Sequence, residues 1–288
     1  MISEKRHSTW PHVTQRVAFG LIWASALGTL VVLGFILAYI LRLGLPHVTW
    51  SFLTTAPEAM GREGGILPTI VGTIALTLGA VVIAAPLGIG AAIFLTEYTW
   101  ESPITRAIRF GAEALAGVPS IIFGLFGFIF FVSYLKMGWS IASGALTLAI
   151  MILPTIIRTA EEAILTVPHP YRDVSFGLGA TRWQMVTSVV LPTALPGIIT
   201  GIILAIGRSV GETAAVIFTA GTALNMPTSV LSPARTMSVH FYILAIEGIS
   251  LEKAYATGAI LIITTLAINV LANWLIVRAV RRNRRRPT

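Results

Sequence analysis

Two ionisable residues, Arg208 and Glu212, lie in a long apolar part of this 288-residue chain. Their spacing predicts that they share one face of a helix. A charged side chain at the centre of a bilayer costs about 2.5 to 3.5 kcal/mol to insert, so it faces a bundle interior, a partner or a water-filled path. A guanidinium group matches phosphate oxygens, and a nearby carboxylate can orient it or accept from a protonated phosphate oxygen. The pair predicts an anion path. The alternative is an ion pair that only holds helices together.

These residues must be positioned by membrane-spanning helices. Hydrophobic residues make up 55% of the chain, charged residues make up 11%, and the mean hydropathy is +0.84, which is too apolar for a soluble domain. A span needs about 20 mostly apolar residues. The segments of about this length predict an all-α integral membrane protein with about six transmembrane helices: 17–41, 66–95, 111–134, 141–157, 194–220 and 256–277.

The basic residues predict how these helices are oriented. The formal net charge is +8, and the arginine-rich run 281–286 directly follows the last span. Cytoplasmic loops are enriched in Lys and Arg, and their distribution here agrees with an even number of spans and two cytoplasmic termini. We expect a multi-pass protein of the cell inner membrane whose basic run meets acidic headgroups, and no nucleic-acid partner. The first span is too long for a secretory signal and is expected to remain uncleaved.

Three other segments carry structural signals. The segments 42–65 and 222–253 are longer than simple turns and can face a soluble partner outside the membrane. The spacing of apolar residues in 238–248 predicts a short interfacial helix. In the third span, Gly117 and Pro119 interrupt the helix, which predicts a bend that can serve gating.

The polar segment 158–192, between the fourth and fifth spans, predicts a short helix, a turn and a second helix, with Asp173 placed to cap a helix start. Its spacing resembles the loop motif of binding-protein-dependent ABC importer permeases: Glu-Ala-Ala, three residues, Gly, nine residues, then Ile-x-Leu-Pro. Asp173-Val174-Ser175 stands at the first element, Gly179 at the glycine and 189–192 at the last. The departures are Val174 and Ser175, which replace alanines.

This resemblance implies the type I ABC importer permease fold and a coupling helix that docks on an ATP-hydrolysing subunit. Polar side chains of such a helix can make directional contacts, and glycines let its backbone pack closely against a partner. The residues expected to serve this coupling loop are Tyr171, Arg172, Asp173, Gly179, Ala180 and Arg182.

The segments 115–121 and 207–213 are also similar to the phosphate-transport permeases of the PstA type, and 50–53 and 64–66 are similar to that subunit rather than to its C-type partner. The resemblance covers most of the chain. It places the family's membrane arginine and glutamate, implicated in transport, at Arg208 and Glu212. It implies as partners a second, PstC-type permease, a dimer of PstB-type subunits that binds ATP, and an external PstS-type phosphate-binding protein.

Four regions are expected along the chain: an N-terminal cytoplasmic tail 1–16, a first helix with its outer segment 17–65, a permease core 66–278, and a basic tail 279–288. The chain has no cysteine, its histidines are scattered, and it has no Gly-x-x-x-x-Gly-Lys-Ser/Thr loop. We therefore expect no metal site, no enzyme activity and no cofactor on this chain, with ATP on the partner. The rival functions are import of sulfate, molybdate or tungstate, a membrane enzyme acting on a phosphorylated lipid, and a scaffold without a pathway.

Overall fold

The computed structural model describes residues 10–284, with side chains described for residues 14–271 and Trp274. Parts of two predicted regions, residues 1–9 and 285–288, lie outside the described residues. The helices and strands are α1 Trp10–Gly44, α2 Trp50–Thr54, β1 Pro57–Glu58, β2 Glu63–Gly64, α3 Leu67–Ile93, α4 Pro103–Ala116, α5 Ser120–Gly127, α6 Ile141–Leu165, α7 His169–Gly177, α8 Arg182–Met185, α9 Leu191–Val210, α10 Ala214–Thr219, α11 Met237–Ile246 and α12 Leu251–Arg284.

Short 3₁₀ and π-helical segments lie next to several of these elements. Leu45–His47 and Ala59–Gly61 form 3₁₀ turns, and π-helical turns cover Phe94–Tyr98 after α3, Phe128–Tyr134 after α5, and Val186–Val190 between α8 and α9. β1 and β2 form one antiparallel pair.

The prediction of an all-α membrane protein with about six spans is confirmed. Within residues 10–284, five segments are long and apolar enough to cross a membrane, and a sixth span is completed if the bent pair α4 and α5 counts as one. The five segments are Thr14–His47, Leu67–Tyr98, Ile141–Leu165, Arg182–Val210 and Leu251–Leu271.

The predicted third span is not one straight helix. α4 and the helix that starts with α5 meet at 99°. Pro119 has no N–H and disfavours helical geometry at Val118, so α4 ends at Ala116 and α5 begins at Ser120. The interruption expected at Gly117 and Pro119 is therefore a sharp corner.

The core of the bundle is built from α3, α6 and α9, which pack along one another. Small residues allow the close approach: a side chain at Gly88 of α3 would overlap Ile156 of α6, and one at Gly201 of α9 would overlap Thr159 of α6. Lipid tails give helices no hydrophobic reason to associate, so tight packing of small residues stabilises such contacts instead.

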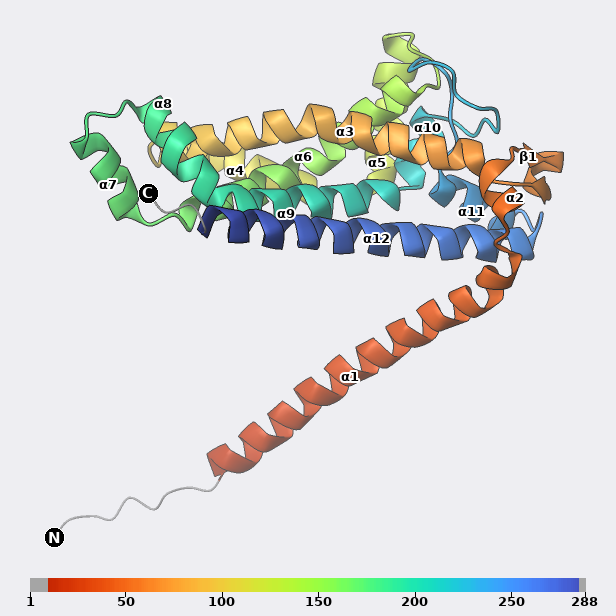
Figure 1. Ribbon diagram of the computed structural model, residues 1–288, viewed down its shortest axis with the longest axis horizontal. Coiled ribbons are helices and arrows are strands. Elements are labelled where there is room, and N and C mark those ends of the chain that lie inside the picture. The colour runs from red at the N-terminus through yellow and green to blue at the C-terminus, as the bar shows by residue number, and fades with distance from the viewer. Residues whose placement is uncertain (1–9, 285–288) are drawn as a thin grey trace.

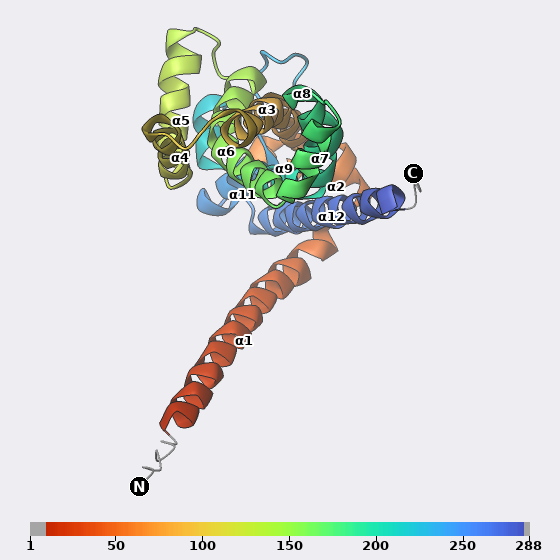
Figure 2. The ribbon, with the colours of Figure 1, turned by 90° about the vertical axis from the view of Figure 1, so that its left-hand side faces the viewer.

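The first helix, α1, stands apart from this core. Figures 1 and 2 show that only the C-terminal end of α1 meets the bundle and that the rest of the helix points away from it at an angle. None of its most apolar stretch is buried. It contacts α12 at that end, where the Tyr39 and Tyr255 rings lie 6.0 Å apart and Gly44 meets the Tyr255 backbone. α1 begins before the span predicted from Val17, and its start and the end of α12 both point toward the end of the molecule that carries α7 (Figure 1).

The opposite end of the molecule carries α2, the strand pair and α11 (Figure 1). The sequence predicted an interfacial helix at 238–248, and α11 is a helix, but it is buried against α12 and α3. Its Met237 N–H donates 2.9 Å to Thr73 Oγ1 of α3. α11 is therefore part of the packed core at this end.

Candidate functional site

The predicted fifth span is broken where its charged residues lie. The helix through α9 begins at Arg182, earlier than the predicted 194, and ends at Val210 with Gly211 as its C-cap. Arg208 therefore lies in the last turn of α9, whereas Glu212 lies beyond the helix in the break before α10. The prediction that both share one helical face is wrong, because glycine at position 211 disfavours continuation and the Glu212 carbonyl is bonded elsewhere.

Arg208 is a partly buried cation with no partner in the described part of the chain. Among the described residues its guanidinium group makes no hydrogen bond and no ion pair, although the side chain is only partly exposed. The neighbouring Ser209 hydroxyl is buried and likewise unpaired within the described part of the chain. The end of α9 thus offers unused hydrogen-bond donors.

Glu212 makes local contacts with the start of α10 and with α11. Its Oε1 accepts the Ala215 N–H at 3.2 Å, and its backbone carbonyl accepts the Ser238 hydroxyl at 2.6 Å. The carboxylate therefore serves as a helix cap here and is not paired with Arg208. The ion pair considered as the structural alternative does not form in this conformation.

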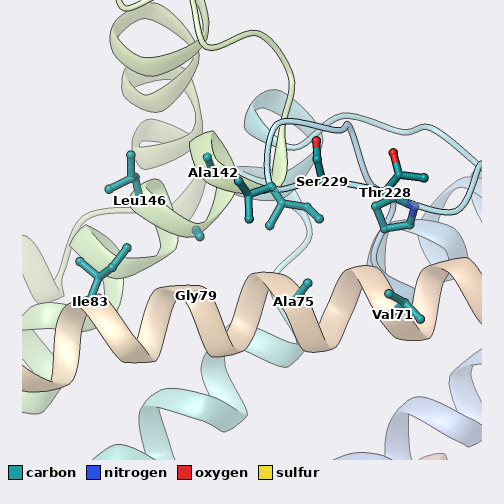
Figure 3. A pocket seen from close by; sticks show the side chains of 12 residues that line it. Val71, Ala75, Gly79, Ile83, Ala142, Leu146, Thr228 and Ser229 are labelled. Atoms are coloured by element: carbon teal, nitrogen blue, oxygen red, sulfur yellow. The ribbon is translucent and has the colours of Figure 1, made fainter.

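An open groove with a volume of about 560 Å³ lies between α3, α6 and the outer loop; Figure 3 shows the side chains that line it. Val71, Ala75 and Ile83 line it from α3, and Thr228 and Ser229 supply its hydroxyls. None of the residues that line it is charged, so it does not suit a multivalent anion.

A smaller crevice of about 170 Å³ lies between α4 and α6 and has charged walls. Arg109 Nε and Glu161 Oε1 are 2.6 Å apart in it, and Arg158 and Glu113 also line it. Arg109 of α4 thus reaches across to Glu161 of α6. The pair joins the amphipathic helix before the corner to a core span.

The coupling loop folds as a helix, a turn and a second helix, as predicted. α7 starts at His169 after Pro168, so Asp173 lies inside α7 and is exposed, and the prediction that it caps a helix start is wrong. Pro170 at the second position of the helix favours this earlier start, because the first turn needs no donor there.

The motif glycine has a conformational reason in this loop. Gly179 has φ +81°, a region that side chains rarely adopt, and it ends α7. Its N–H donates to Phe176 O at 2.9 Å and the Ala180 N–H donates to Ser175 O at 3.0 Å. This pair of bonds is the Schellman arrangement that satisfies a helix C-terminus. A Thr181–Gln184 capping box then starts α8.

Arg172 and Arg182 both contact Glu97, a residue that sequence reasoning missed. Arg172 forms a buried ion pair with Glu97, which follows α3, at 2.6 Å. Arg182 Nη1 donates to the Glu97 backbone carbonyl at 3.2 Å, and its guanidinium carbon lies 5.7 Å from the centre of the Tyr98 ring. Glu97 ends an apolar run, which is the one sequence signal that could have marked it.

The outward face of the loop is apolar. Its exposed side chains include large hydrophobic ones, which seldom cluster on the surface of a soluble protein. They are Tyr171, Val174, Phe176, Leu178 and Trp183. Leu178 is 83% exposed. This surface has the composition of a protein contact.

The outer segment contains a buried cation and a buried histidine. Arg235 Nε donates to Thr222 O at 2.8 Å, and its Nη1 lies 3.3 Å from His240 Nδ1. Burial lowers the pKa of Arg235, opposed by Glu247. Burial, followed by the charge of Arg235, lowers the pKa of His240 to about 4. The imidazole is therefore neutral at physiological pH, with Nδ1 accepting from the guanidinium group. Within residues 10–284, no group of three His, Cys, Asp or Glu residues is placed to hold a metal ion.

The bundle of spans carries at one end a short helix pair with an apolar exposed face. The sequence profile of the binding-protein-dependent transport system inner membrane components matches residues 84–285, and the chain belongs to this family. It is thus a multi-pass ABC transporter permease.

Curated relatives cover most of the chain. It is 35% identical to a probable ABC transporter permease protein, YqgI, of Bacillus subtilis over 91% of this chain and 95% of the relative. It is 32% identical to the phosphate transport system permease protein PstA of Yersinia pestis, over 94% and 93%. It is 33% identical to the corresponding PstC protein of Mesorhizobium japonicum, over 80% and 79%.

Solved structures share the fold. A bacterial alginate ABC transporter in complex with an alginate-bound periplasmic protein aligns with a TM-score of 0.67 at 16% identity, over 93% of this chain and 97% of that chain. The methionine transporter MetNI in an inward-facing form aligns with a TM-score of 0.62 at 18% identity, over 74% and 95%. The expected type I importer permease fold is confirmed.

Proposed function

We propose that this chain is the PstA-type permease subunit of an ATP-driven importer of inorganic phosphate in the cell inner membrane, with both termini in the cytoplasm. The observation that carries the proposal is the unpaired, partly buried Arg208 at the end of α9. A partly buried guanidinium group with no carboxylate partner among the described residues favours an anion that arrives from outside the chain. Similarity to PstA and PstC proteins supports phosphate as that anion.

Phosphate is distinguished from sulfate by its proton. Hydrogen phosphate has an oxygen-bound proton at neutral pH, and a carboxylate such as Glu212 can accept it. Sulfate has no proton to donate and meets the carboxylate as a like charge. The break that separates Arg208 from Glu212 lets the two side chains act as separate donor and acceptor.

The pathway would lie between this chain and a PstC-type permease. The apolar groove of Figure 3 is unsuited to an anion, and Arg208 needs a facing surface to complete a site. An external PstS-type protein would deliver phosphate to the end that carries α2 and α11. The corner at Gly117 and Pro119 is proposed as a place where the pathway bends during gating.

ATP would be bound and hydrolysed by a PstB-type dimer, and no cofactor is proposed on this chain. The coupling loop would dock on that dimer through its apolar face, including Tyr171 and Leu178. Asp173, exposed on the same helix, would add a polar contact, while Gly179 and Ala180 shape the turn. Nucleotide binding would then shift the population of inward-open and outward-open states.

The test is ATP-dependent phosphate uptake into vesicles that contain the complete complex. Arg208→Gln is expected to lower uptake about tenfold or more, the size of one lost charge-assisted hydrogen bond, with assembly unchanged. Arg158→Gln is the matched control, because Arg158 is exposed and pairs only with Glu162 within its own helix.

Each outcome separates the proposal from a rival. Unchanged uptake in Arg208→Gln would remove Arg208 from the pathway. Wild-type uptake of sulfate or molybdate in place of phosphate would assign another oxyanion. Product formation from a phosphorylated lipid by the chain alone would indicate an enzyme, and an assembly defect without a transport defect would indicate a scaffold.

A further inference from the structure

The contact between Glu97 and Arg172 connects two elements 75 residues apart in the chain. Arg172 Nη2 donates to Glu97 Oε1 at 2.6 Å, and Nε lies 3.1 and 3.2 Å from Oε1 and Oε2. The exposed fractions of the two side chains are 5% for Glu97 and 11% for Arg172. A two-point contact of this kind fixes orientation as well as distance.

The same guanidinium group also holds the end of α6. Its Nη1 donates to Val167 O at 2.7 Å and its Nη2 donates to Ile164 O at 3.1 Å. One side chain of α7 is therefore joined to the cytoplasmic ends of α3 and α6 together. Arg182 adds a hydrogen bond from α8 to the Glu97 backbone.

Helix α3 continues from this contact to the other end of the molecule. Its Thr73 Oγ1 accepts the Met237 N–H of α11, and the next residue of α11, Ser238, donates to the Glu212 carbonyl in the break after α9. A continuous helical segment with polar bonds at both ends is a physical route by which a displacement of α7 reaches the break.

We propose that Glu97 is a positioning residue that locks the coupling helix α7 to the span α3, so that the two move as one body during the ATPase cycle. The inference rests on the proposed function, because it assumes that α7 is the element on which the ATPase acts. Arg172 then acts inside this chain, and docking is left to the apolar face and the exposed Asp173. Removing the Glu97 charge leaves Arg172 buried without its counterion and frees α7 from α3.

The first arm of the test compares Glu97→Gln with Glu162→Gln, whose carboxylate forms an exposed pair at 3.1 Å in the same cytoplasmic region. Phosphate uptake and ATP hydrolysis are measured together in vesicles that contain the complete complex. Glu97→Gln is expected to lower the number of phosphate ions transported per ATP hydrolysed by at least about fivefold, while the ATPase stays bound. Fivefold is about the lower limit of the usual coupling between two sites in a protein. Glu162→Gln is expected to match wild type. An unchanged ratio in Glu97→Gln would overturn the proposal.

The second arm keeps the proposal testable if Glu97→Gln fails to fold. The chain has no cysteine, so Glu97→Cys with Arg172→Cys gives a unique thiol pair for a short bifunctional thiosulfonate. We expect equal cross-linking in nucleotide-free and vanadate-trapped complexes, and recovery of the transport ratio after cross-linking. Cross-linking that falls in the trapped state, or that blocks turnover, would show that α7 and α3 separate. The comparison of trapped and free states does not depend on the substrate, so an absence of wild-type phosphate uptake would count only against the proposed function.

Discussion

The Ser238 hydroxyl donates a 2.6 Å hydrogen bond to the backbone carbonyl of Glu212. This bond satisfies a carbonyl that the end of α9 leaves outside the helix, and it ties the break to buried α11. The backbone at position 212 is thus fixed independently of its carboxylate. Substitutions of that side chain can therefore separate its charge from its role as a cap.

Glu212→Gln is expected to retain the cap and lose the charge. The amide oxygen can still accept the Ala215 N–H, so thermal stability should stay near wild type, whereas Glu212→Ala should lose about 1 kcal/mol. Both substitutions remove the negative charge that disfavours sulfate, and Glu212→Ala also removes the acceptor for a phosphate proton. The measurement is competition between phosphate and sulfate in uptake, together with thermal unfolding. Retained phosphate preference in both variants would show that the carboxylate is structural.

His240 is expected to make stability depend on pH. Its pKa falls from the ordinary 6.5 to about 4 on folding, so the stabilisation is complete above about pH 6.5 and declines as pH falls toward 4. At pH 5 the loss amounts to roughly 2 kcal/mol. Thermal unfolding at about pH 7.5 and about pH 5 measures it, and His240→Gln should show a smaller difference between the two. An equal difference in both proteins would contradict the assignment.

Leu178→Glu is expected to weaken binding of the ATPase subunits about tenfold or more, because it puts a charge into an apolar contact. The side chain is 83% exposed in this chain, so folding should be unaffected. Val230→Glu is the control, because Val230 is 67% exposed in the outer loop, far from α7. Co-purification of the ATPase with each variant gives the comparison. Undiminished co-purification of Leu178→Glu would move the docking surface elsewhere.

Much of the fold could be predicted from local signals. Long apolar runs predict spans because the bilayer imposes their length, and the motif spacing around Gly179 predicts the coupling loop. The corner at Pro119 was also predictable in position, since proline removes a donor, but its 99° angle depends on packing against α6 and α10.

The site was less accessible to sequence reasoning because its contacts are long-range. Arg208 and Glu212 have helical spacing, and a bond from Ser238 stabilises the break that separates them. Glu97 resembles any polar residue at the end of a span until the fold brings Arg172 to it. Contacts between residues this far apart leave no periodic pattern in one sequence.

The isolation of α1 has a consequence for how the protein is made. Its backbone hydrogen bonds are internal, and the core of α3, α6 and α9 packs without it. Insertion of the first helix and compaction of the remainder are therefore separable events in biogenesis. The final tilt of α1 is set by whichever lipid or neighbouring subunit it meets, since the described residues hold it at the junction near Gly44 and Tyr255.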